Sequence, residues 1–311
     1  MTPVFHPING FKTFDLGAEG PEDILELDDG ALLCGNASGQ LLRVEPGLGA
    51  VSVAAQIGGR GLGLDRLPDG RILVCNAELG LQAVDLERGA VELLVDNIDG
   101  EAQRFCNNAA VAKDGTVFFS SSTTRNGVEH STKDLVEGQK TGRLFRRNTD
   151  GSVDTLLADI LFANGVALSP DEDFVLVNST GNYCIHRVWL KGEKAGQSDL
   201  FAHELPGFPD NLSVGSDGLL WLALVTPVTP VLKKLESLPL WLRWVIARLP
   251  EPSSQKPADA AFCLAFEWDG SVKYALEDQS GVFNFTTCAR EHSGRVYLGS
   301  LTGQRIGYFD L

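Results

Sequence analysis

Four polar residues recur at one fixed distance from a turn in four separate segments of the sequence. They are Glu22, Asn107, Asn164 and Asp210, and each lies eight residues before its turn position, which is Gly30, Gly115, Glu172 or Gly218 respectively. Two carboxylates and two carboxamides, with no histidine or cysteine among them, are the donor set of a hard cation. Ca²⁺ suits this set because it accepts about six to eight oxygens in a loose geometry, and other divalent cations are the alternatives. A lone Asn or Asp usually supports the turn itself, but four residues in one register favour a shared metal site.

Three further polar residues follow directly after these positions. They are Asp23, Asn108 and Asn211. We expect them to contact the substrate or to orient the metal ligands, because they share the same segments.

If a cation bound there promotes a reaction, a nearby group must accept a proton. Asp210, or alternatively Glu22, would lie beside the ion and serve as this base, although a carboxylate that binds a cation is a weak one. His130 and His292 are the alternative bases, because histidine titrates near neutral pH. The chain contains no Gly-x-Ser-x-Gly motif, which argues against a serine hydrolase.

The four segments recur because the chain contains an internal repeat. Each unit has a turn, an apolar strand, a small polar turn and a second alternating strand. The units begin at Asp28, Pro68, Lys113, Pro170, Ser216 and His292, about 40 residues apart at first and up to about 75 where other segments intervene. This spacing is typical of a four-stranded propeller blade. The sequence therefore predicts an all-β fold, a six-bladed β-propeller that forms one domain over residues 1–311, with an array of β-sandwiches as the alternative.

A propeller would bring the polar segments together. The loops that enter its innermost strands converge on one end of the central channel. We therefore expect Glu22, Asn107, Asn164 and Asp210 to point into one small volume around the pseudo-sixfold axis.

Two segments interrupt the repeat. Residues 125–141 are polar and predict a long loop or a short helix in the third blade, whereas residues 231–249 predict an inserted amphipathic helix. Pro230 and Pro250 bracket this helix, and Pro239 is expected to break or kink it. Its apolar residues include Leu232, Leu235, Leu242, Ile246 and Leu249, and its basic residues are Lys233, Lys234, Arg243 and Arg248. The helix would pack on the propeller, cover a ligand cavity or contact a membrane surface, and a cover would favour an apolar ligand.

Composition excludes several classes of protein. The chain has 41 acidic and 26 basic residues and a formal net charge of −15, which argues against nucleic acid as a partner. Six cysteines without a Cys-x-x-Cys pair argue against a zinc knuckle and fit reduced thiols. The first residues lack the basic and apolar regions of a signal peptide, and no apolar run reaches the ~18 residues of a membrane span. We expect a cytoplasmic protein, with peripheral membrane association through the 231–249 helix as an additional prediction.

Several motifs resemble a known family. FANGVALSPDEDFVLV, GFPDNLSVGSDG, EGQKTGRLF and REHSGRVYLGSL resemble the strictosidine synthase-like proteins, including the adipocyte plasma membrane-associated type. The chain is more distantly similar to the gluconolactonase/regucalcin and paraoxonase families. The match covers essentially the whole chain. It implies a six-bladed propeller, a divalent cation in the channel, usually calcium, and in many members the hydrolysis of lactones or other esters.

The resemblance also assigns residues. It places the metal ligands on Glu22, Asn107, Asn164 and Asp210, and it matches Asp23 and Asn211 to paraoxonase-like positions, with Asp23 nearer a second, structural ion. Asn108 departs from the common Asn-Asp pair, and Thr287 stands where strictosidine synthases have a glutamate. Condensation of an amine with an aldehyde is therefore not expected.

The sequence as a whole predicts a calcium-dependent hydrolase. Its partner would be a small-molecule lactone or related ester with apolar character. The alternatives are hydrolysis of aryl esters or phosphotriesters, and a metal-containing propeller that binds without turnover.

Overall fold

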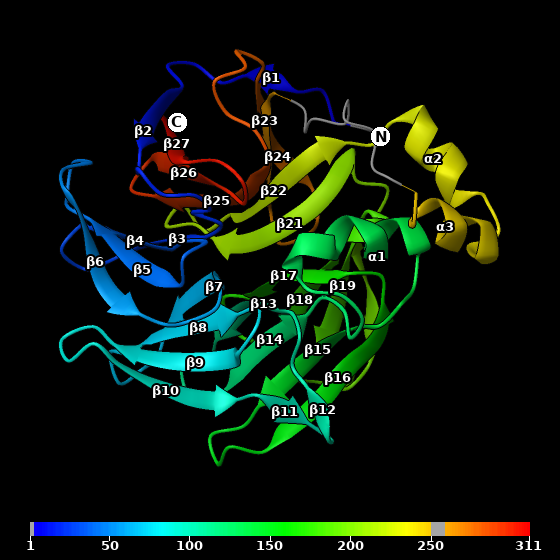
Figure 1. Ribbon diagram of the computed structural model, residues 1–311, viewed down its shortest axis with the longest axis horizontal. Coiled ribbons are helices and arrows are strands. Elements are labelled where there is room, and N and C mark those ends of the chain that lie inside the picture. The colour runs from blue at the N-terminus through cyan, green and yellow to red at the C-terminus, as the bar shows by residue number, and fades with distance from the viewer. Residues whose placement is uncertain (1–2, 250–258) are drawn as a thin grey trace.

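The computed structural model describes residues 3–249 and 259–311, and its strands form six antiparallel sheets around a central channel (Figure 1). Each sheet is one blade with four strands, and the fifth blade gains an extra edge strand. The innermost strand of every blade contacts the innermost strand of the next, and the last contacts the first. The prediction of a six-bladed β-propeller is confirmed.

The first three blades follow one another in chain order. Blade 1 contains β3 (Ile24–Glu26), β4 (Leu32–Gly35), β5 (Gln40–Val44) and β6 (Val51–Gln56). Blade 2 contains β7 (Gly61–Arg66), β8 (Ile72–Asn76), β9 (Gly80–Asp85) and β10 (Ala90–Val95). A small ribbon of β11 (Asn97–Ile98) and β12 (Glu101–Ala102) leads to blade 3, which contains β13 (Cys106–Val111), β14 (Val117–Ser121), β15 (Gly142–Arg147) and β16 (Val153–Ile160).

The last three blades complete the ring. Blade 4 contains β17 (Ala163–Leu168), β18 (Phe174–Ser179), β19 (Cys184–Trp189) and β20 (Ser198–Ala202). Blade 5 contains β21 (Gly207–Val214), β22 (Leu220–Pro227), β23 (Ala261–Phe266) and β24 (Val272–Asp278), with β1 (His6–Pro7) parallel to β24. Blade 6 contains β25 (Thr286–His292), β26 (Arg295–Ser300), β27 (Arg305–Asp310) and β2 (Lys12–Asp15).

The two ends of the chain close the ring. β2 is the outermost strand of blade 6, where Lys12 pairs with Tyr308 and Phe14 with Ile306. Backbone hydrogen bonds thus join the N-terminal segment to the last blade (Figure 1). The closure holds the first and last blades together, so every innermost strand keeps a fixed place around the channel.

The hydrophobic core lies between neighbouring blades. Six clusters of buried side chains fill the six junctions, from blades 1 and 2 round to blades 6 and 1. The second strands of several blades, including β8, β14 and β18, are buried along their whole length. This explains the continuous apolar runs, since such strands face another sheet on both sides. Burial of one Leu, Val or Phe side chain stabilises the folded protein by about 1.5–3 kcal/mol.

Short helices lie over part of the ring. η1 (Val128–His130) and α1 (Ser131–Glu137) occupy the insertion between β14 and β15, and η2 (Thr180–Asn182) follows β18. The predicted 231–249 helix folds as two helices, α2 (Pro230–Glu236) and α3 (Leu240–Ile246). The break comes at Pro239, as expected, whereas Pro250 lies outside the described residues. Figure 1 shows α2 and α3 side by side next to α1.

The outward face of α2 and α3 is apolar and aromatic. Val231 and Trp241 are 74% and 68% exposed, and Trp244 stacks against the guanidinium of Arg248. In the described part of the chain, no helix combines the length and apolarity needed to cross a membrane. Contact of this face with a membrane surface stays a prediction.

Candidate metal and active site

The candidate ligands lie at irregular points of the innermost strands. The register between the innermost and second strands shifts around the pairs Asn107–Asn108, Asn164–Gly165 and Asp210–Asn211. Such bulges take residues out of the regular alternation of a strand and redirect their side chains. In blade 1 the strand begins at Ile24, directly after Glu22 and Asp23. A bulge therefore presents polar side chains to the channel in blades 3, 4 and 5, whereas in blade 1 the two residues just before the strand do so.

The four predicted ligands line one cavity of about 490 Å³ in the channel. Glu22, Asn107, Asn164 and Asp210 are each no more than 7% exposed. Each has one buried oxygen without a hydrogen-bond partner, namely Glu22 Oε2, Asn107 Oδ1, Asn164 Oδ1 and Asp210 Oδ1. An unpaired buried polar atom costs about 1–3 kcal/mol, so four of them in one cavity call for a shared partner. The donor set fits a hard divalent cation.

Neighbouring hydrogen bonds orient these oxygens. Asn107 Nδ2 donates to Ser122 Oγ at 2.9 Å, which leaves the amide oxygen free. Asn211 Nδ2 donates to Glu22 Oε1 at 3.0 Å, and Thr287 Oγ1 donates to the backbone oxygen of Glu22 at 2.7 Å. In Asn107 and Glu22, these partners leave one side-chain oxygen free to face the cavity. In the part of the chain that the structure describes, no cluster of three or more His, Cys, Asp or Glu residues forms a metal site, so this site depends on its two carboxamides.

The two carboxyl groups of the site are held in an unfavourable environment without a cation. Burial raises the pKa of Asp210 to about 8, and the neighbouring Asn164 carboxamide offsets part of the rise. Burial, followed by the charges of Asp210 and Asp23, raises the pKa of Glu22 well above its usual range. The hydrogen bond from Asn211 and then the guanidinium of Arg60 oppose this rise. A bound cation would stabilise the charged form of both groups.

Asp23 does not face the cavity with a free oxygen. Its Oδ1 accepts from the backbone N–H of Ile24 at 2.9 Å and from Arg290 Nε at 3.1 Å. Its Oδ2 accepts from the backbone N–H of Leu64 at 2.9 Å and from Arg290 Nη2 at 2.7 Å. The guanidinium of Arg290 therefore supplies the positive charge beside Asp23, where the family resemblance implied a second ion.

Asn108 and Asn211 also hold the blades in place. Asn108 Oδ1 accepts a hydrogen bond from the backbone N–H of Val166 in the next blade at 2.9 Å. Asp23 in blade 1 accepts the equivalent bond from the backbone N–H of Leu64 in blade 2. Asn211 reaches Glu22 across the channel. Gly165 occupies the matching position in blade 4, where a Cβ would collide with the backbone nitrogen of Leu212. These positions fix the distance between neighbouring innermost strands.

The structure does not bring the two predicted histidines to the cavity. His130 is exposed at the start of α1. Thr287 is near the start of β25, whereas His292 is the last residue of this strand, and its side chain is 51% exposed. Its Nε2 lies 3.5 Å from Glu26 Oε1. Among the described residues that line the cavity, Glu22 and Asp210 are the ionisable side chains. The geometry therefore favours these carboxylates over the histidines for proton transfer.

Four phenylalanines form an apolar wall that the sequence analysis missed. Phe105, Phe162, Phe208 and Phe285 all line the cavity, and each stands two residues before a channel position, at Asn107, Asn164, Asp210 and Thr287 respectively. Phe105 and Phe162 pack edge to face, with ring centroids 5.3 Å apart. This constant interval was a usable signal in the sequence. The wall places apolar surface in the same cavity as the four unpartnered oxygens.

Comparisons with known proteins identify the family of the chain. A family model described as "SMP-30/Gluconolactonase/LRE-like region" matches residues 25–229, a range that contains Asn107, Asn164 and Asp210. The chain belongs to the SMP-30/gluconolactonase/LRE-like family. The chain is 31% identical to the adipocyte plasma membrane-associated protein of Rattus norvegicus, over 93% of this chain and 82% of the relative. It is also 31% identical to strictosidine synthase-like protein 13 of Arabidopsis thaliana, over 72% of this chain and 57% of the relative.

Solved structures share the family's propeller. A gluconolactonase from Xanthomonas campestris aligns with a TM-score of 0.66 and 18% identity, over 98% of this chain and 91% of the other. Regucalcin from Agrobacterium tumefaciens, described as a calcium-binding protein, aligns with a TM-score of 0.60 and 16% identity, over 92% and 86%. At these identities the alignments establish the fold.

Proposed function

We propose that this protein is a divalent-cation-dependent hydrolase of lactones or related esters, with Ca²⁺ as the expected ion. The observation that carries the proposal is the set of four buried, unpartnered oxygens from four blades in one cavity. Membership of a family that includes gluconolactonases supports the lactone class. A solved relative described as calcium-binding supports the choice of ion.

The residues of the cavity suit this chemistry. A cation held by the four oxygens would polarise the substrate carbonyl and stabilise the charge that develops on its oxygen. Asp210, with Glu22 as the alternative, accepts a proton from the attacking water. The water oxygen then bonds to the carbonyl carbon, the bond to the leaving alkoxy oxygen breaks, and the proton passes from the carboxyl group to that oxygen. The phenylalanine wall keeps bulk water away from the reacting groups.

Assays of purified protein test the proposal. Lactones, aryl esters and phosphotriesters would be offered to the protein before and after chelation, with metal content measured by elemental analysis. We expect turnover of a lactone or ester that chelator removes and Ca²⁺ restores. Absence of turnover in every class with the metal fully bound would favour the alternative, a propeller that binds without catalysis.

Ca²⁺ is expected to stabilise the protein more at pH 8 than at pH 5.5. The raised pKa of Asp210, about 8 against about 3.9 in the unfolded chain, means that the folded metal-free protein binds more protons over this interval. Its unfolding free energy therefore falls as the pH rises through this interval. Ca²⁺ binding needs the charged carboxylate and so strengthens with pH.

Thermal melts in chelator and in saturating Ca²⁺ at both pH values give the measurement. At about 100 times the dissociation constant, bound Ca²⁺ raises the melting temperature by roughly 5 °C. The chelated Asp210→Asn variant is the control, because the contribution of this group to the pH dependence should disappear in it. An equal rise in melting temperature with Ca²⁺ at both pH values would contradict the prediction. No rise at either pH would contradict the proposed metal site itself.

A further inference from the structure

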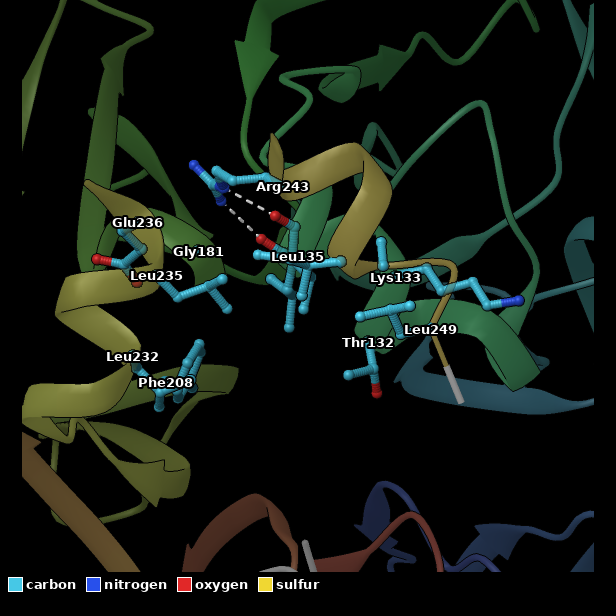
Figure 2. Close-up of a pocket in the computed structure, with 13 residues that line it drawn as sticks. Thr132, Lys133, Leu135, Gly181, Phe208, Leu232, Leu235, Glu236, Arg243 and Leu249 are labelled. Carbon is cyan, nitrogen blue, oxygen red and sulfur yellow. Dashed lines mark hydrogen bonds between the residues drawn. The ribbon is translucent and has the colours of Figure 1, made fainter. Parts of the chain in front are cut away.

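A second cavity of about 290 Å³ adjoins the channel cavity and is enclosed by α1, α2 and α3 (Figure 2). We call it the helix chamber. The two cavities share four wall residues, which are Thr132, Leu135, Phe208 and Leu232. Figure 2 shows Leu135, Leu232, Leu235 and Leu249 around the open space. A molecule whose head lies at the four ligand oxygens would therefore have this chamber next to it.

Two of the charged residues in the chamber wall, Arg243 and Glu236, are engaged by the protein. Arg243 Nε donates to the backbone oxygen of Val136 at 2.7 Å, and Nη2 donates to that of Leu135 at 3.0 Å. Glu236 accepts a hydrogen bond from the hydroxyl of Tyr183. The side chain of Lys133 extends away from the centre of the chamber (Figure 2). The surface that remains for a ligand is mainly apolar, because Arg243 and Glu236 are paired within the protein and most of the other wall residues are aliphatic or aromatic.

The chamber is held in shape by contacts between the helices. Arg243 binds the C-terminal carbonyls of α1, directly beside Gly138, where a Cβ would collide with the guanidinium. The buried Glu137 pairs with Arg248 at 2.8 Å and with Arg125 at 3.2 Å. These contacts tie the segment after blade 5's second strand to the insertion of blade 3. The chamber is thus formed before a ligand arrives, which lowers the entropic cost of binding.

We propose that the helix chamber binds an unbranched apolar tail of the substrate, an alkyl or acyl chain attached to the ester or lactone group in the channel. The inference rests on the proposed function for the position of the head group. Taking about 30 Å³ for a water-sized group, the chamber holds on the order of ten carbon atoms. The substrate class is therefore a medium-chain lactone or ester and not a sugar lactone.

A chain-length series tests the tail site. For 4-nitrophenyl esters or alkyl lactones of increasing tail length, kcat/KM should rise about fourfold per buried methylene and stop rising once the chamber is full. Ala247 lines the helix chamber but not the channel cavity, and its side chain is buried. Ala247→Phe should shorten the preferred tail and lower kcat/KM for a ten-carbon substrate by about tenfold or more. The acetyl ester should stay within about twofold of the unchanged protein.

Two variants serve as matched controls. Val245→Phe adds a ring on the same helix at a residue that is 42% exposed and outside the chamber wall, so it should not change the chain-length profile. Val136→Phe fills the chamber from α1 and should act like Ala247→Phe, which covers the case in which one variant folds poorly. A profile that is flat with tail length, or that neither filling variant shifts, would overturn the tail site.

Binding without turnover separates this inference from the proposed function. Saturated fatty alcohols of four to twelve carbons would be titrated calorimetrically into the full-length protein in chelator. Affinity that grows with chain length and is weakened by Ala247→Phe but not by Val245→Phe supports the tail site even if no ester is hydrolysed. Ester hydrolysis without any such binding would retain the proposed function and overturn the tail site.

Discussion

Replacement of Asp210 by asparagine is expected to lower cation-dependent turnover by about a thousandfold or more. The variant keeps the shape of a side chain that is 7% exposed but removes one of the two negative charges that face the cavity. Charge on the ligands sets the affinity of oxygen sites for Ca²⁺, and electrophilic stabilisation by a metal contributes several kcal/mol to catalysis. Each 1.36 kcal/mol corresponds to a factor of about ten in rate.

Two measurements on this variant distinguish the roles of Asp210. Loss of both bound metal and kcat/KM would identify Asp210 as a ligand, whereas loss of activity with the metal retained would identify it as the proton acceptor. Asp154→Asn is the matched control, because Asp154 is an exposed residue of β16 that pairs with Arg146 at 2.7 Å. Full activity of Asp210→Asn would remove this residue from the mechanism.

Replacement of Arg290 by methionine is expected to destabilise the fold by about 3–5 kcal/mol, because it leaves the carboxylate of Asp23 buried without its cation. Asp23 is fully buried, and two of its four hydrogen bonds come from Arg290. The same guanidinium donates to the backbone oxygen of Leu64 at 2.7 Å, so it also joins blade 6 to blade 2. Denaturant unfolding of the metal-free protein measures the loss.

Arg295→Met provides the comparison for this prediction. Arg295 also pairs with an aspartate at 2.7 Å, but its side chain is 38% exposed and that of Asp310 is 66% exposed. Such a surface pair contributes less than about 1 kcal/mol. The double variant Asp23→Asn/Arg290→Met should lose less than the sum of the two single losses, since it removes the unpaired charge. Equal losses of unfolding free energy for Arg290→Met and Arg295→Met would show that the buried Asp23–Arg290 pair stabilises the fold no more than a surface pair does.

The number of blades and the polar residues that meet in the channel were predictable because both follow from local spacing. An apolar strand after each turn gives a repeat of blade length, and residues in the same register meet around a closed ring. Glu22, Asn107, Asn164 and Asp210 were selected in this way, and all four line the same cavity. The break at Pro239 was predictable for a local reason too, since proline cannot donate the backbone hydrogen bond that a continuous helix needs.

The roles of other residues depended on distant contacts. His130 and His292 were plausible bases by residue type, but the insertion and the far end of β25 place them outside the cavity. Asp23 was expected to contact the substrate or to orient the metal ligands, yet it binds Arg290, which is 267 residues away in the chain. Spacing along a chain carries no information about which of two adjacent carboxylates meets a guanidinium from another blade.

By itself, the sequence determined the fold, the register of the oxygen donors and the chemical class of ion that suits them. These follow from side-chain type and from intervals of a few residues, which the covalent chain and the repeat preserve. Only the tertiary structure decided which oxygens stay unpaired, which carboxylate is neutralised internally, and how three short helices enclose an apolar chamber beside the channel. Those outcomes depend on closure of the ring and on packing between blades 3 and 5, where residues far apart in the chain compete for the same partners.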